Sequence, residues 1–77
     1  MEEILKLIIT SLVDNKEAVE IEKTEKGGKE VYQVKVDSSE MGKVIGKQGK
    51  IAHSIRTIAK SVGMAKENKR VEVEFVD

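Results

Sequence analysis

A G-x-x-G tetrapeptide, residues 46–49, lies between two apolar segments of this sequence. Glycine adopts backbone angles that other residues avoid, and it lets a ligand approach the main chain without a Cβ in the way. The amides that open the following helix have no intrahelical acceptor and carry the positive end of the helix dipole. Lys43, Lys47 and Lys50 add cations around the same point. This combination predicts a receptor for a phosphodiester backbone.

The sequence lacks two other phosphate-binding motifs, because its glycines do not have the required spacing. A nucleoside-triphosphate loop requires G-x-x-x-x-G-K-[ST], but Gly42 and Gly46 are four positions apart and Lys50 is followed by Ile51. The dinucleotide motif G-x-G-x-x-G fails because position 44 is valine. The glycines therefore do not indicate a nucleotide cofactor.

The distribution of charge supports a polyanion site. The formal net charge is zero, yet residues 1–41 carry a net −4 and residues 42–77 a net +4. No acidic residue lies between Glu40 and Glu67, whereas five lysines and Arg56 fall in that stretch. A neutral protein with a patch of one sign can attract a polyanion locally. A solvated basic helix face is the alternative, and the coincidence with the glycines favours the first interpretation.

Apolar periodicity predicts the elements that position these residues. Gly27-Gly28 is typical of a two-residue hairpin turn between two strands. The six predicted elements are helix 2–14, strand 19–22, strand 32–36, a short helix 38–45, helix 50–62 and strand 71–75. Three strands with three helices on one face would bury the apolar stripes.

Several finer expectations concern helix ends and the core. Asp37 followed by Glu40 resembles a capping box for the short helix. Gly63 is expected to end the long helix as a C′ residue, with Met64 as its apolar contact. The inward stripe of that helix is expected to be Ile51, Ile55, Ile58 and Val62, and both aromatic residues, Tyr32 and Phe75, are expected in the core.

The string Val44-Ile45-Gly46-Lys47-Gln48-Gly49 resembles the V-I-G-x-x-G core of the KH family of nucleic-acid-binding domains. The whole chain resembles the small stand-alone bacterial KH proteins of the KhpA type, over essentially all 77 residues. The resemblance implies a single KH domain over residues 1–77. It also implies an α+β fold of the type II arrangement, α-β-β-α-α-β, with a mixed three-stranded sheet and three helices packed on one face.

The same resemblance implies binding of single-stranded RNA, with single-stranded DNA left open, by a loop that clamps the sugar-phosphate backbone. One of Val44 and Ile45 is expected to be partly exposed in a groove where bases lie. A regulator or RNA chaperone linked to cell shape and cell-wall processes is implied, acting as a homodimer or with a second KH protein. The candidate nucleic-acid-binding residues are Lys43, Val44, Ile45, Gly46, Lys47, Gln48, Gly49, Lys50 and His53.

Other function classes receive little support from the residues. His53 is the only histidine and there is no cysteine, so no metal site and no cofactor are expected. No nucleophile-base pair is visible, which favours a non-enzyme. With an acidic N-terminus and no long apolar run, we expect a cytoplasmic protein without a membrane partner.

The alternative function is an interaction or dimerisation subunit with little nucleic-acid binding. Leu7 widens the apolar side of the first helix, either as core or as an interface.

Overall fold

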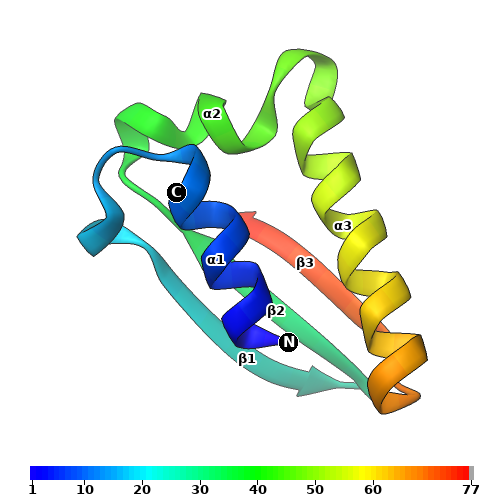
Figure 1. Ribbon diagram of the computed structural model, residues 1–77. Helices are drawn as coiled ribbons and strands as arrows, with labels where there is room; N and C mark the ends of the chain where they lie inside the picture. The colour runs from blue at the N-terminus through cyan, green and yellow to red at the C-terminus, as the bar shows by residue number, and fades with distance from the viewer. Residues whose placement is uncertain (77) are drawn as a thin grey trace.

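The computed structural model describes residues 1–76, and its helices and strands follow the predicted order α-β-β-α-α-β (Figure 1). The first helix stops before the predicted end at residue 14. None of the helices in residues 1–76 has the length and apolar character of a membrane span. The elements are α1 (Glu2–Leu12), β1 (Glu20–Lys26), β2 (Lys29–Lys35), α2 (Met41–Ile45), α3 (Lys50–Val62) and β3 (Val71–Val76).

The strands form one mixed sheet in the order β1-β2-β3. β1 and β2 are antiparallel and meet at Gly27 and Gly28, whose φ angles of +57° and +81° suit the predicted hairpin turn. β2 and β3 are parallel, so the chain crosses between them through α2 and α3. The three helices lie on one face of the sheet (Figure 1). The predicted α+β class with a mixed three-stranded sheet is therefore confirmed.

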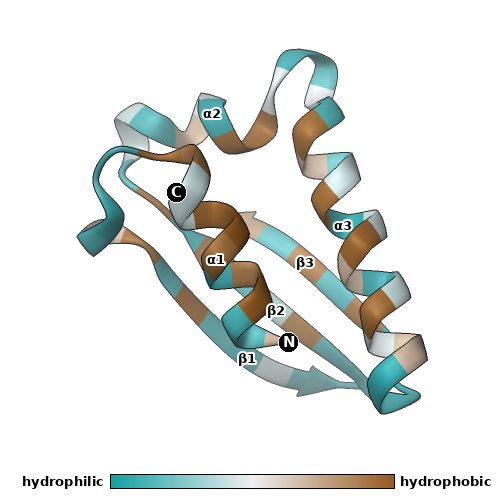
Figure 2. Cartoon of the chain, in the orientation of Figure 1, coloured by the Kyte–Doolittle hydropathy of each residue, from teal (hydrophilic) through white to brown (hydrophobic). Residues whose placement is uncertain are grey.

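The core lies where the apolar sides of the helices meet the covered face of the sheet (Figure 2). Tyr32 is only 3% exposed, and Phe75 is partly buried and packs against the core. Both aromatic side chains thus take the core positions that strand alternation predicts. The largest fully buried apolar side chains are Leu5, Ile9, Val34, Val44 and Val71.

The predicted inward stripe of α3 is wrong in part. Ile55 is buried as expected, but the residues beside it on the buried face are Ala52 and Ala59. Ile51 and Ile58 are 36% and 45% exposed. Steps of three and four residues fit both sets equally well, and apolar size alone favoured the isoleucines. The alanines occupy the buried face because their small side chains let the helix lie close to the sheet.

The end of α3 also differs from the prediction. Gly63 has helical angles (φ −59°, ψ −45°), and the helix continues into a π turn over Gly63–Glu67. The left-handed residue that ends this turn is Asn68, at φ 52° and ψ 40°. A Cβ on Gly63 would lie 2.5 Å from Cγ2 of Val71. Glycine is therefore needed there for close packing, and Met64 is 53% exposed instead of forming the expected contact.

The predicted capping box forms only on one side. Asp37 accepts a hydrogen bond from the Ser39 amide at 3.0 Å and so begins the 3₁₀ turn before α2. Glu40 turns away and accepts from the amides of Asp14 and Asn15 at 2.6 and 2.9 Å. These amides hold the pKa of the Glu40 carboxyl below its ordinary value. Glu40 consequently ties α2 to the segment that follows α1.

Candidate nucleic-acid interface

The glycine loop, residues 46–49, turns the chain between α2 and α3 (Figure 1). Gly46 has φ 76° and ψ 177°, a conformation open essentially to glycine alone. A Cβ there would also lie 2.6 Å from Cγ1 of Ile51. Gly49 is left-handed at φ 73° and ψ 16°, and no atom lies within 4 Å of its ideal Cβ position. Gly46 is thus required by the fold, whereas the space outside Gly49 is open to a ligand.

The tip of the glycine loop presents main-chain donors. The amide of Gly49 donates to the Gly46 carbonyl at 3.2 Å, and the amide of Lys50 donates to the Lys47 carbonyl. Within residues 1–76, the amides of Lys47 and Gln48 donate to no main-chain carbonyl. Gln48 is left-handed at φ 56° and ψ 25°, which sharpens the turn. The donors free for an anion are therefore those of the tip, before the helix begins.

Four of the predicted side chains surround this tip. Lys47, Gln48 and Lys50 are exposed, and none of them belongs to an ion pair within the described residues. His53 is exposed on the first turns of α3, whereas its neighbour Ala52 is buried. Cations and hydrogen-bond donors thus meet at one end of the molecule, which suits a phosphate ligand.

Lys43 is held differently from the other candidate lysines. Its Nζ lies 3.0 Å from a carboxylate oxygen of Asp14 and 3.1 Å from one of Glu40. Both hydrogen bonds raise the pKa of Lys43 above its ordinary value. The lysine fastens α2 to the end of α1, so a phosphate would have to compete with two carboxylates for it.

The structure separates Val44 from Ile45. Val44 is 0% exposed and packs in the core, so its assignment to the binding surface is wrong. The cause is the helical turn of α2, which points Val44 toward the sheet. Ile45 is partly exposed and precedes Gly46. Of the two residues, Ile45 is therefore the one that can line a groove.

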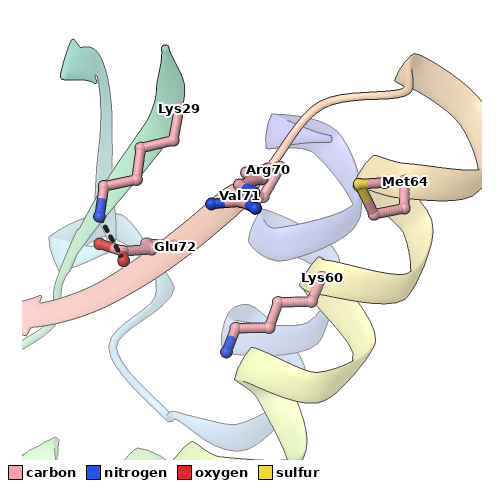
Figure 3. A pocket seen from close by; sticks show the side chains of 6 residues that line it. All are labelled: Lys29, Lys60, Met64, Arg70, Val71 and Glu72. Carbon is pink, nitrogen blue, oxygen red and sulfur yellow. Dashed lines mark hydrogen bonds and ion pairs between the residues drawn. The ribbon is translucent and has the colours of Figure 1, made fainter. Parts of the chain in front are cut away.

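A groove between α3 and β3, here called the α3–β3 groove, contains residues outside the set of candidate binding residues predicted from the sequence. Two adjoining hollows of about 240 and 380 Å³ lie in it and share Lys60 and Glu72. Figure 3 shows the larger one, with Lys60 and Met64 on the helix side and Glu72 paired to Lys29 on the sheet side. The lining residues are Lys29, Arg56, Lys60, Met64, Arg70, Val71, Glu72 and Val73.

The sequence does indicate part of the α3–β3 groove. Arg56 and Lys60 lie in the stretch without acids, and their spacing of four puts them on one face of the helix that follows the glycines. Nothing in the local pattern says that this face borders β3, because that follows from the parallel crossover. The residues of β3 could therefore not be assigned from the sequence.

Some large apolar side chains remain at the surface. Leu7 on α1 is 72% exposed, so it does not belong to the core. On α3, Ile58 is 45% exposed. Such side chains are common singly on protein surfaces, and in groups they mark interfaces. The exposure of Leu7 is thus incompatible with the interpretation of this residue as core.

Comparison with known proteins agrees with this geometry. The family model of the KhpA/KhpB KH domain matches residues 2–75. Proteins named RNA-binding protein KhpA from Caldanaerobacter subterraneus subsp. tengcongensis and Clostridium perfringens are 46% and 43% identical, over 99% of this chain and 100% of theirs. One from Aquifex aeolicus is 42% identical over 100% of this chain and 96% of its own.

A solved structure supports the fold independently. The crystal structure of a variant of Aquifex aeolicus Era, bound to GDP and AlF4−, matches with a TM-score of 0.67. The match covers 95% of this chain and 28% of the Era chain at 17% sequence identity, so it concerns the fold alone. Together with the family model and the full-length relatives, the glycine loop and the mixed sheet show that this chain belongs to the KhpA/KhpB family of KH domains.

Proposed function

We propose that this protein binds single-stranded RNA, with the glycine loop on the backbone and the α3–β3 groove along the bases. The observation that carries the proposal is the exposed tip of the loop, where the free amides of Lys47 and Gln48 adjoin the ammonium groups of Lys47 and Lys50. The related proteins named RNA-binding protein KhpA support the choice of RNA. KH domains clamp about four nucleotides in this way.

Each exposed candidate residue has a task in this proposal. The absence of a Cβ at Gly49 leaves space for a phosphate, and Lys47 and Lys50 neutralise its charge. Ile45 provides an apolar contact for a base or sugar, and His53 offers a hydrogen bond on the first turns of α3. Few aromatic side chains are available for stacking, so each base is bound weakly and the affinity is modest. The proposed role as an RNA regulator or chaperone rests on the resemblance to KhpA-type proteins alone.

The salt dependence of binding tests the proposed contact with phosphates. Three or four phosphates on a single strand give a slope of about −2 to −3 for log affinity against log salt concentration, from roughly −0.7 for each contact. Replacing Lys50 with methionine is expected to make the slope shallower by less than about one unit. Fluorescence anisotropy with a labelled RNA at several salt concentrations measures both slopes. A slope near zero for the parent protein would reject phosphate recognition.

We further propose that the protein self-associates as a symmetric homodimer, or pairs with another KH protein, through exposed apolar surface. Leu7 on α1 and Ile58 on α3 are the candidate contacts, at 72% and 45% exposed. Two linked grooves make the second RNA contact intramolecular and raise avidity. Light scattering at tens of micromolar is expected to show a dimer that Leu7→Glu or Ile58→Glu dissociates, with a loss of RNA affinity.

The adjacent polar position on α3 provides the control for this experiment. Thr57→Glu adds the same charge on an exposed residue and should leave the dimer intact. A strictly monomeric parent protein whose affinity is unaffected by both apolar substitutions would contradict dimerisation. If these substitutions changed assembly while RNA binding was absent throughout, the alternative of an interaction subunit would hold.

A further inference from the structure

Two contacts hold Arg56 at the free edge of β3. Its Nε donates a hydrogen bond to the Val73 carbonyl at 3.1 Å, and its guanidinium carbon lies 5.5 Å from the ring centroid of Phe75. β3 is the outermost strand, and the carbonyl of Arg70 in the preceding segment accepts from Glu30 on β2. Since carbonyls alternate in direction along a strand, that of Val73 faces away from β2 and into the α3–β3 groove.

This arrangement changes the hydrogen-bonding character of the edge. A free edge strand offers unpaired carbonyls, which would accept N–H groups from a base. Arg56 covers the Val73 carbonyl and puts donors in its place. An arginine has five N–H donors, and within residues 1–76 only that on Nε is used. The helix wall of the groove therefore presents a guanidinium fork.

The strand wall provides the matching acceptor. Glu72 lines the same 240 Å³ hollow as Arg56 and Lys60. One carboxylate oxygen of Glu72 is 2.7 Å from Nζ of Lys29, which fixes the side chain at the groove (Figure 3). The hollow thus has cationic donors on its α3 side and a carboxylate on its β3 side.

We propose that this hollow is a base-reading subsite that selects guanine, a proposal that depends on the RNA binding proposed above. Guanine carries adjacent acceptors, O6 and N7, which fit the fork of Arg56. Its other edge carries N1–H and N2–H₂, which a carboxylate such as that of Glu72 accepts. Adenine would place its N6–H₂ donor against the guanidinium, and the pyrimidines lack the O6/N7 pair.

The position of the subsite agrees with a strand that starts at the glycine loop. From Lys50 to Arg56 the helix rises about 9 Å, at 1.5 Å for each residue. A single strand advances at least about 3.4 Å for each nucleotide. The guanine would therefore lie within about three nucleotides of the phosphate bound at the loop, which is inside the reach of one KH groove.

Base preference tests the proposal directly. We would titrate the full chain with short uridine oligonucleotides of equal length that carry one central guanosine, adenosine or cytidine, or none. The guanosine strand is expected to bind at least about fivefold more tightly than the others. Arg56→Lys keeps the charge but not the fork, so it should erase this preference and give the guanosine and adenosine strands equal affinities. Arg56→Met uncovers the Val73 carbonyl and should shift the preference toward adenosine.

Lys66 offers a control for loss of a cation. It is exposed and lines neither hollow, so Lys66→Met should retain the guanosine preference. Thermal melts of all variants verify the fold. Equal affinity of the parent for the four strands, or a guanosine preference that survives Arg56→Lys, would overturn the subsite while RNA binding stands. Absence of binding to every strand would overturn both the subsite and the proposed function.

Discussion

Replacing Lys47 and Gln48 with aspartate is expected to lower RNA affinity at least about a hundredfold while the protein stays folded. Two carboxylates would then face the phosphates at the point where the free amides converge, and like charges across an interface cost several kcal/mol. Both side chains are exposed. Aspartate tolerates the left-handed angles found at Gln48, so the turn can survive the exchange. Fluorescence anisotropy measures the affinity, and circular dichroism verifies the fold.

The β1–β2 hairpin supplies a control with the same change of charge. Lys26→Asp with Gly27→Asp alters the net charge equally, at the end of the molecule opposite the glycine loop (Figure 1). Gly27 has φ 57° and open space around it, and Asp-Gly suits such a turn. The control should bind RNA within about threefold of the parent under the screening of 0.15 M salt. A loop variant that binds as well as the parent would reject the loop as the RNA clamp.

Most of the fold was predictable because each element has a clear local period. The alternation in β3 and the Gly27-Gly28 turn each specify one structure, and the observed sheet contains them. The choice of buried face on α3 was not predictable in the same way. It depends on how closely the helix approaches the sheet, and that distance favours Ala59 over Ile58. The prediction that Gly63 ends α3 was wrong for a related reason, because Val71, which packs against this glycine, belongs to another element.

The site was predictable where it is continuous in the sequence. The glycine loop and its cations lie within a few residues of each other, so spacing alone located them. Lys43 was assigned to the phosphates because it lies close to the glycines in the sequence, whereas one of its two ion-pair partners, Asp14, is distant in the sequence. Arg56 and Glu72 line the same hollow only because the parallel crossover places β3 beside α3. Contacts of that kind follow from the assembled sheet and not from the motif.

The two glycines of the loop are expected to differ sharply in what they contribute to stability. Gly46→Ala combines a backbone region that costs about 1–3 kcal/mol with a clash against Ile51 that costs about 1–3 kcal/mol more. In a domain of this size each kcal/mol lowers the melting temperature by about 4–8 °C. The two terms together cost about 2–6 kcal/mol, so the melting temperature should fall by about 8–48 °C, measured by circular dichroism. Gly49→Ala has only the left-handed penalty of about 1–2 kcal/mol, because its Cβ meets nothing.

Substitutions at Gly46 and Gly49 are also expected to differ in their effect on RNA affinity. A Cβ on Gly49 points into the open space where the phosphate is proposed to lie, so Gly49→Ala should weaken binding although most of the protein remains folded. Gly49→Asn suits the left-handed angles better and should restore stability without restoring affinity. Affinity that recovers together with stability in the asparagine variant would show that Gly49 serves the turn alone. Equal melting temperatures for Gly46→Ala and Gly49→Ala would contradict the close packing of Gly46 on Ile51.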